Sequence, residues 1–327
     1  MEKLTRDIDK LGGYLKRQGW LFANENITAV EVPGEGNMNF TLRIKTTERS
    51  FVIKQSRDYV EKFPQVAAPV ERAIRESEFY SLISDHNILK WQMPKLNGVD
   101  RYNHVLNFQD LGNGVDCTYL YQKDEYLEET DLQKIMVFAS TLHKSINTDV
   151  TNVRLPNRKM RKLNHEHIFI YPYIWKNGLN LDDILPGLKE IGDNLKSDDV
   201  LKYRVQKLGE MYLADGKTLL HGDYFPGSWF KTPDDIKIID PEFCFFGRPE
   251  FEIGVTVAHL KMSSQPITLI DKALKIYMDS APLDKDLCFQ FMAIEILRRL
   301  LGLAQLPLSL DLEERKALLE EARSILV

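Results

Sequence analysis

Residues 217–254 read KTLLHGDYFPGSWFKTPDDIKIIDPEFCFFGRPEFEIG, and this stretch decides the fold expected for the rest of the chain. Two short apolar runs, 218–220 and 236–239, are separated by residues that favour turns, including Pro226-Gly227 and Pro233-Asp234-Asp235. Short apolar runs around such turns are typical of strands joined as a hairpin. The stretch therefore predicts that these two runs pair with each other.

Acidic residues follow both predicted strands. Asp223 lies just beyond the first strand, and Asp240 and Glu242 end the second. If the strands pair, the three carboxylates converge, and carboxylates that converge need a cation, a shared proton or a reaction that uses their charge. Phosphoryl transfer uses the charge of all these carboxylates, because one of them orients the hydroxyl nucleophile while the others hold Mg²⁺. Asp223 is the expected catalytic residue, and Asp240 and Glu242 are the expected metal ligands.

The order of these motifs resembles a known superfamily. HGD at 221–223 followed by a strand that ends in Ile239-Asp240 is similar to the aminoglycoside phosphotransferase and choline kinase superfamily, which has a protein-kinase-like fold. The narrower patterns HGDxxxGS and DPEFxFxG resemble the 5-methylthioribose kinases. Most of the superfamily has Asn where this chain has Ser228, and the role of Ser228 stays open.

The composition is that of an ordinary globular protein. The chain has 327 residues, of which 43% are hydrophobic and 28% charged, and this is enough for two lobes with their own cores. The net charge is −5 and no stretch is strongly basic, so we expect neither nucleic acid nor a membrane surface as a partner. A homodimer is among the open options for the oligomeric state.

The cysteines and histidines give no sign of a metal site. Cys117, Cys244 and Cys288 are far apart and form no CxxC pair, which indicates reduced thiols and a cytoplasmic location. The amino terminus lacks the apolar core of a signal peptide, and no run approaches the ~20 apolar residues of a membrane span. His165 and His167 form an HxH pair without further ligands, which is typical of a polar surface.

The amino-terminal part predicts a nucleotide-binding lobe. A helix is expected over 1–23, followed by strands over 29–32, 40–44 and 50–54. The turn between the first two strands contains glycines, which let a backbone approach phosphates closely. The residues expected to contact the nucleotide there are Gly34, Gly36, Asn37 and Asn39.

Lys54 ends the third of these strands. Kinase-like folds place a lysine there that contacts the nucleotide phosphates, and an acid on the next helix, expected over 69–84, holds it. Glu76 and Glu78 lie about 200° apart around that helix, so only one can face Lys54. Similarity of Arg75-Glu76-Ser77-Glu78 to the superfamily's Arg-Glu-Ala-Glu favours Glu76.

The resemblance implies an α+β, protein-kinase-like fold of two lobes. The small lobe, residues 1–110, is a mostly antiparallel sheet with a helix, and the larger lobe, residues 111–327, is mainly helical. A strand at 105–108 runs into the hinge, where main-chain groups of Gln109, Asp110 and Leu111 are expected to bind adenine. A helix is also expected over 132–146, with His143 as a packed or capping residue.

An apolar helix near the carboxy terminus carries charges. Glu295, Arg298 and Arg299 lie within the otherwise apolar segment 289–303, and buried charges are costly unless they are paired or bound. One interpretation is that Glu295 pairs with one arginine at i+3 or i+4 while the other reaches solvent. The other follows from the resemblance, since a pair of arginines contacts the substrate in 5-methylthioribose kinases.

The expected function is ATP- and Mg²⁺-dependent phosphorylation of a hydroxyl on a small metabolite, with methylthioribose first among the acceptors. Three departures from the family pattern bear on the acceptor: Tyr224-Phe225-Pro226 replaces Leu-His-Thr, Glu252 stands where Asp is usual, and the chain is shorter. An aminoglycoside or choline-like acceptor stays open. A catalytically silent nucleotide-binding module is the alternative outside enzymes, although Lys54, Asp223 and Asp240 are all present.

Overall fold

The chain forms two compact units in a computed structural model that describes residues 2–34 and 38–327. The first unit consists of Met1–Val115 together with Lys231–Cys244, and the second consists of Asp116–Phe230 and Phe245–Val327. The segment with Asp240 and Glu242 therefore folds with the amino-terminal residues, although Asp116–Phe230 separates them in sequence. The expected division of the domains after residue 110 stays a prediction.

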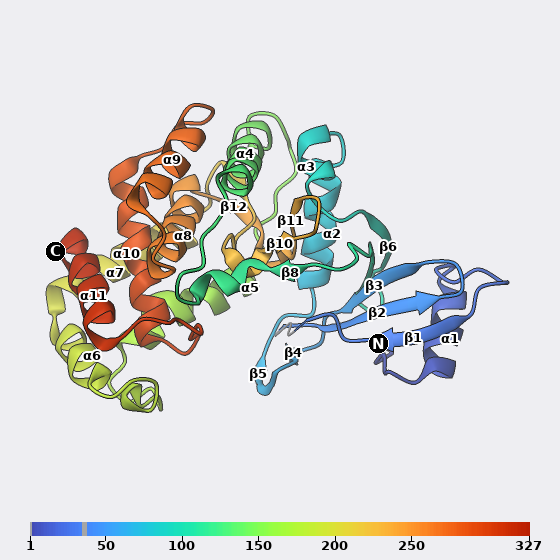
Figure 1. Cartoon of the computed structure of the whole chain (residues 1–327), viewed down its shortest axis with the longest axis horizontal. Coiled ribbons are helices and arrows are strands. Elements are labelled where there is room, and N and C mark those ends of the chain that lie inside the picture. The colour runs from blue at the N-terminus through green and yellow to red at the C-terminus, as the bar shows by residue number, and fades with distance from the viewer. Residues whose placement is uncertain (1, 35–37) are drawn as a thin grey trace. The chain divides into compact units, whose positions relative to one another are not determined.

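A five-stranded antiparallel sheet in the order β1-β2-β3-β7-β6 forms the first unit, with two helices after its third strand (Figure 1). Two short strands, β4 and β5, pair separately. The elements of this unit are α1 (Ile8–Arg17), β1 (Ile27–Glu31), β2 (Phe40–Thr46), β3 (Ser50–Gln55), β4 (Tyr59–Val60), β5 (Phe63–Ala67), α2 (Arg72–Ile83), α3 (Asn87–Trp91), β6 (Leu96–Asp100), β7 (Val105–Gln109), β11 (Ile236–Ile238) and the 3₁₀ turn η6 (Pro241–Phe243).

The two faces of this sheet pack against different helices, because successive side chains of a strand point to opposite faces. On one face Phe51 and Ile53 join a core that includes Leu11 and Leu15 of α1. On the other face Val52 packs in the cluster around Ala73 of α2. The alternation along β3 places Lys54 on the same face as Val52, and this is the face that α2 covers.

The first helix is shorter than expected. The helix predicted over 1–23 begins only at Ile8, where Asp7 caps it by accepting a hydrogen bond from the backbone N–H of Lys10. It ends at Arg17, two residues before Gly19, whose φ of 69° is not helical. The strands and the helix after β5 agree with the prediction within about three residues at each end.

The predicted hairpin of 218–220 with 236–239 is wrong. β9 (Thr218–Leu220) pairs with β12 (Phe245–Gly247), and β11 pairs with β10 (Trp229–Lys231), which lies next to β8 (Val115–Asp116) in a small sheet. A tight turn, in which the backbone N–H of Thr232 donates to the carbonyl of Asp235 at 2.8 Å, joins β10 to β11. A local turn closes a much shorter loop than the expected hairpin does. The pairing of these two strands therefore cannot be the reason for a convergence of Asp223 with Asp240 and Glu242. That convergence stays a prediction.

Helices make up most of the second unit. Besides the strand pair β9–β12, this unit contains α-helices, the 3₁₀ turns η1 and η3 to η5, and the π-helical turn η2. In chain order they are η1 (Cys117–Tyr121), α4 (Glu129–Ser145), α5 (Arg158–His165), η2 (Glu166–Ile170), η3 (Tyr171–Tyr173), η4 (Leu181–Asp183), α6 (Leu188–Ser197), α7 (Asp199–Leu213), η5 (Pro226–Ser228), α8 (Pro249–Met262), α9 (Ile267–Met278), α10 (Lys285–Leu301) and α11 (Leu312–Leu326).

Two buried helices, α8 and α10, lie at the centre of this unit (Figure 1). Almost every residue of α8 and of the second half of α10 is buried. Their backbones approach closely at Gly254, where a Cβ atom would lie 2.6 Å from the carbonyl oxygen of Cys288. No helix in the described part of the chain is both long and apolar enough to cross a bilayer.

Candidate active site

Lys54 is held between two carboxylates in the first unit. Its Nζ lies 2.8 Å from Glu76 Oε2 on α2 and 2.8 Å from Asp240 Oδ1 just before η6. Glu78 instead pairs with Arg75 on the same helix. The predicted pairing of Lys54 with Glu76 is therefore confirmed, and the open choice between the two acids is decided by the face of α2 that packs on the sheet.

This arrangement keeps Lys54 charged. Burial alone would lower its pKa, but the carboxylates of Asp240, Glu76 and Glu242 raise the pKa above its ordinary value. Asp240 differs from its neighbours, because 53% of its side chain is exposed. Its φ of 62° is left-handed, a conformation that costs energy for residues other than glycine and is often found at functional sites.

Glu242 is buried, and Asn39 and Arg72 both contact its Oε2. Its Oε2 accepts a hydrogen bond from Asn39 Nδ2 at 2.8 Å and lies 3.2 Å from Nε of Arg72. The Oδ1 atom of Asn39 accepts from Ser56 Oγ and from Arg72 Nε, each at 2.9 Å. The Asn39 side chain, expected to contact nucleotide, thus links Glu242 to the base of the β1–β2 turn. Sequence reasoning missed Arg72, which stands three residues before the Arg75-Glu76 motif.

The turn between β1 and β2 is described only in part. Gly34 has a φ of 67°, which an L-residue rarely adopts, so glycine suits the backbone at this point. Gly36 and Asn37, two of the expected nucleotide contacts, lie outside the described residues. The contribution of this turn to phosphate binding stays a prediction.

The expected hinge residues follow β7. The backbone N–H of Gln109 donates to the carbonyl of Lys95, whereas Asp110 forms an ion pair with Arg43 at 3.0 Å and accepts from the backbone N–H of Gly112. These bonds order the segment, including Leu111, through side chains and not only through the strand. Adenine binding by its main-chain groups stays a prediction.

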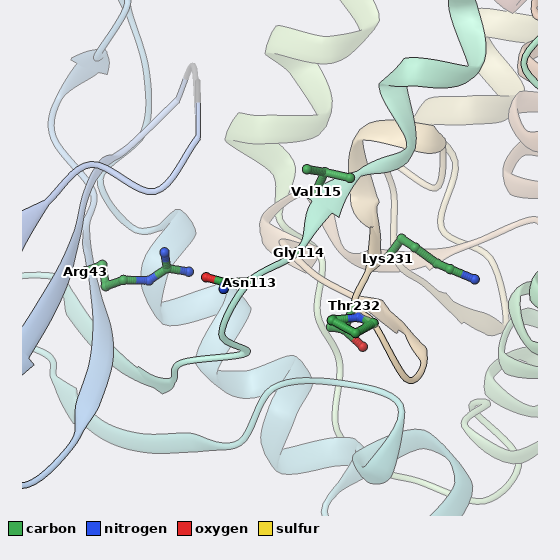
Figure 2. A pocket seen from close by; sticks show the side chains of 7 residues that line it. Arg43, Asn113, Gly114, Val115, Lys231 and Thr232 are labelled. Atoms are coloured by element: carbon green, nitrogen blue, oxygen red, sulfur yellow. The ribbon is translucent and has the colours of Figure 1, made fainter.

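An open hollow of about 570 Å³ lies beside this segment (Figure 2). Arg43 and Asn113 point toward one another at one side of it, and Lys231 points away (Figure 2). Its lining consists of Arg43, Asn113, Gly114, Val115, Lys231, Thr232 and Pro233. None of these was an expected site residue.

Asp223 lies in the loop after β9, in the second unit. Gly222 before it has a φ of 87°, and Ser228 Oγ donates a 2.6 Å hydrogen bond to the carbonyl of Asp223. Ser228 therefore closes the loop on itself. Tyr224 is buried, donates from its hydroxyl to the carbonyl of Ile135, and packs face to face with Phe138. Its departure from the family pattern is thus accommodated by packing against α4.

Glu252 on α8 holds the backbone of this loop. Its carboxylate accepts from the N–H groups of His221 at 3.1 Å and of Gly222 at 2.6 Å. It also lies 2.9 Å from Nε2 of His143, whose Nδ1 lies 2.7 Å from the hydroxyl of Tyr277. Burial would raise the pKa of Glu252, but the hydrogen bond and charge of His143 and the backbone donors lower it below its usual value. His143 is a packed residue, as predicted.

Both arginines of α10 pair with the same acid. Arg298 Nη1 lies 2.9 Å from each oxygen of Glu295, and Arg299 Nε lies 2.7 Å from Oε1. The interpretation in which one arginine pairs and the other reaches solvent is therefore wrong, because both are buried. Burial would raise the pKa of Glu295, but Arg298 and Arg299 lower it well below its usual range.

The two arginines have different neighbours. The Arg299 guanidinium lies 4.9 Å from the ring centre of Phe225 in the Asp223 loop, and Asp223 is among the charges that raise its pKa above the usual value against burial. Arg298 contributes to a lowered pKa of His167, after burial of that histidine. Arg299 therefore faces the loop that carries Asp223, and Arg298 faces the segment around η2.

His259 extends this network. Its Nε2 lies 3.1 Å from Glu295, and its Nδ1 lies 2.6 Å from the Tyr121 hydroxyl. Because an ionised carboxylate only accepts, Nε2 carries a proton, and in the neutral ring Nδ1 accepts from the tyrosine hydroxyl. Burial lowers the pKa of His259 to about 4. The network keeps the only acid among these groups, Glu295, fully bonded.

Asp240 and Glu242 suit a magnesium ion better than a transition metal. Mg²⁺ takes oxygen ligands and commonly only one or two carboxylates beside phosphates and water. Over residues 2–34 and 38–327, no group of three or more His, Cys, Asp or Glu is arranged to hold a metal. The half-exposed carboxylate of Asp240, next to the positioned carboxylate of Glu242, fits a magnesium site with two carboxylate ligands.

Sequence comparison finds methylthioribose kinases as relatives of this chain. Methylthioribose kinase from Bacillus cereus (strain G9842) is 26% identical over 262 residues, which cover 77% of this chain and 64% of that protein. The one from Exiguobacterium sibiricum is 27% identical over 271 residues, covering 75% and 64%. Methylthioribose kinases are homologues of this chain. The chain spans about two thirds of the length of these methylthioribose kinases, and no protein-family model matches it.

Solved structures share the fold. LicA, a choline kinase from Streptococcus pneumoniae, was solved with AMP and matches with a TM-score of 0.56 at 14% identity, over 98% of this chain and 100% of that one. Spectinomycin phosphotransferase APH(9)-Ia with ADP and spectinomycin gives 0.56 at 15%, over 97% and 96%. This homologue of the methylthioribose kinases therefore has the kinase-like fold that was predicted, α+β with a small antiparallel sheet and a mainly helical second part.

Proposed function

We propose that this chain is an ATP-dependent kinase that phosphorylates a hydroxyl of a small sugar-like metabolite, with 5-methylthioribose as the first candidate acceptor. The observation that carries the proposal is Lys54 on β3, held 2.8 Å from both Glu76 and Asp240. Kinase-like enzymes need this lysine–glutamate pair to hold the nucleotide phosphates. The names of the relatives, and the AMP and ADP in the solved neighbours, support the donor and the acceptor class.

In the proposed reaction the acceptor hydroxyl oxygen forms a bond to the γ-phosphorus of ATP, and the bond to the β–γ bridging oxygen breaks to release ADP. Asp223 orients the hydroxyl and takes its proton. Lys54 contacts the phosphates and neutralises part of their charge. Mg²⁺, held by Asp240 and Glu242, would supply further positive charge on the phosphates when it is bound. The turn with Gly34 and the hinge at Gln109 would hold the rest of the nucleotide.

The charges of α10 favour a neutral or anionic acceptor. A cationic acceptor such as choline or an aminoglycoside calls for acidic or aromatic groups, whereas Arg299 beside Phe225 brings a guanidinium toward the Asp223 loop. Guanidinium groups donate hydrogen bonds in a planar fork to sugar oxygens or phosphates. We therefore assign substrate contacts to Arg299, with Arg298 as the second candidate.

The partners, the location and the end of the nucleotide-binding lobe complete the proposal. A small-molecule acceptor, without nucleic acid or membrane, is the proposed partner, and a homodimer stays open. The buried thiols of Cys117, Cys244 and Cys288, none of which forms a disulfide within the described residues, favour the cytoplasm. The nucleotide-binding lobe is proposed to end near residue 110.

The test is a coupled assay of ADP release with a panel of acceptors: 5-methylthioribose, ribose, choline and an aminoglycoside. We expect Mg²⁺-dependent turnover with methylthioribose that exceeds turnover with the others, and its loss in Asp223→Asn. Turnover with choline or the aminoglycoside alone would reassign the acceptor. ADP binding without turnover on any acceptor would support the silent nucleotide-binding module.

A further inference from the structure

The guanidinium of Arg72 is completely buried at the start of α2. A buried arginine is tolerated only when its donors are bonded, because an unpaired buried charge is strongly destabilising. Its partners are Asn39 Oδ1 at 2.9 Å, the carbonyls of Arg57 at 2.7 Å, Pro69 at 2.8 Å, Met38 at 2.8 Å and Tyr59 at 3.4 Å, and Glu242 Oε2 at 3.2 Å.

These partners come from separate parts of the first unit. Met38 and Asn39 form the end of the β1–β2 turn, and Glu242 belongs to η6, 203 residues after Asn39. Asn39 closes the arrangement, since its Nδ2 donates to the same Glu242 oxygen that Arg72 contacts. Both contacts fall on Oε2 and thereby fix the orientation of the carboxylate.

The planar fork of arginine explains why this residue stands here. Its donors diverge within one plane at fixed angles, so Nη2 reaches the Met38 carbonyl while Nε reaches Asn39 and Glu242. A displacement of Met38 or Asn39 therefore acts on Glu242 through one rigid group. Lysine would keep the charge but has no such fork.

We propose that Arg72 is a positioning residue that couples Met38 and Asn39, the residues just before β2, to the metal carboxylate, so that Glu242 is set for Mg²⁺. The inference rests on the proposed function, because it assigns nucleotide to the turn and Mg²⁺ to Glu242. Arg72 itself contacts neither the nucleotide nor the metal in this arrangement. Loss of its fork weakens the contribution of Mg²⁺ to nucleotide binding more than it weakens nucleotide binding itself.

The chain offers a matched control in Arg161. This arginine is also buried, and it lies in the second unit, where it pairs with Asp215 at 2.7 Å and donates to the carbonyls of Tyr212 and Ala214. Arg72→Lys and Arg161→Lys thus remove the same kind of buried fork. Both are expected to lower the melting temperature, which reports the structural part of each role.

The deciding measurement is ADP affinity by calorimetry on the full chain, with Mg²⁺ and with EDTA. For Arg72→Lys we expect the gain in ADP affinity from Mg²⁺ to fall by about 10-fold or more, the scale of groups that orient a metal ligand. For Arg161→Lys the gain should stay at the wild-type value. If Arg72→Lys melts earlier but keeps the wild-type gain, Arg72 is merely structural and the inference is overturned.

A second variant covers the case in which Arg72→Lys does not fold. Asn39→Ala removes the Nδ2 bond to Glu242 and the Oδ1 acceptor of Arg72, but leaves the buried Arg72–Glu242 pair in place. It should reduce the Mg²⁺ gain in the same direction, by a smaller factor. An unchanged gain in Asn39→Ala, with Arg72→Lys unfolded, overturns the coupling. Failure of the proposed function shows elsewhere: a wild-type chain that binds no ADP, or gains nothing from Mg²⁺, removes the function and the inference together.

Discussion

Glu252 Oε2 accepts a 2.6 Å hydrogen bond from the backbone N–H of Gly222, the residue immediately before Asp223. The other oxygen accepts from the N–H of His221 and meets His143. The Glu252 carboxylate, which lies on the buried helix α8, thus accepts hydrogen bonds from two backbone N–H groups of this loop. Glu252 therefore helps to position Asp223, together with Ser228, whose hydroxyl bonds the Asp223 carbonyl.

Replacing Glu252 by Gln should therefore destabilise the Asp223 loop, although the two side chains are nearly the same size. The amide NH₂ group cannot accept, so at least one buried backbone N–H is left unsatisfied, at a cost of roughly 1–3 kcal/mol. We expect a lower free energy of unfolding in urea together with a lower kcat. Thr256→Val is the control, since it removes a hydroxyl bond from α8 to the carbonyl of Tyr224 in the same loop. Equal loss of kcat in both variants would show that Glu252 has no special role.

Asp223→Asn tests the proposed base. The amide keeps the shape of the side chain but cannot take the acceptor proton, so turnover should fall by about 10² or more while ATP binding stays nearly unchanged. Single-turnover kinetics and ATP titration measure the two separately. A variant that turns over at the wild-type rate would exclude Asp223 as the base.

Asp240→Ala tests the proposed metal ligand. Loss of this carboxylate should weaken ADP binding in the presence of Mg²⁺, because the phosphate charge is less neutralised. In EDTA the affinity should fall less or even rise, since Lys54 then keeps only Glu76 as its partner and is freer to meet the phosphates. Identical titrations with Mg²⁺ and with EDTA, both matching the wild type, would contradict the assignment.

Arg299→Lys and Arg298→Lys should differ. Because the Arg299 guanidinium lies over Phe225 beside the Asp223 loop, its substitution should raise the acceptor KM strongly, with ATP affinity little changed. Arg298→Lys should mainly lower the melting temperature, since its guanidinium holds both oxygens of Glu295. Steady-state kinetics and thermal melting of the two variants decide this. Equal KM values in both would mean that the pair is structural.

Stability should fall as the pH drops from about 6.5 to about 4, partly because of His259. The ordinary pKa of histidine is 6.5, and burial lowers that of His259 to about 4. Between these values the unfolded chain binds the proton and the folded chain does not, so protons favour unfolding, by up to roughly 3 kcal/mol for a shift of this size. His259→Asn cannot titrate, and its unfolding free energy should depend less steeply on pH over this window. An unchanged slope would contradict the neutral buried ring.

Local patterns were sufficient to predict several elements of the first unit. Alternating side chains gave the strands around Lys54, and the spacing of acids on the following helix left two choices, of which the resemblance favoured Glu76. The structure confirms the pairing of Lys54 with Glu76. The prediction succeeded because β3 and α2 are near in sequence, and because the side of α2 that packs on the sheet carries Glu76. Periodicity and motif order therefore carried this part of the site.

The tertiary structure alone decided the contacts between distant segments. β9 pairs with β12 and not with β11, because the turn at Thr232 gives β11 a nearer partner. Arg72 reaches Glu242, and Glu252 reaches Gly222, across 170 and 30 residues of chain. Sequence periodicity reports which face of an element is apolar, but a buried charge finds its partner in whichever element packs against that face. The sequence by itself thus proposed Lys54, Asp223 and Asp240 as site residues, while only the packed chain revealed the groups that hold their surroundings in position.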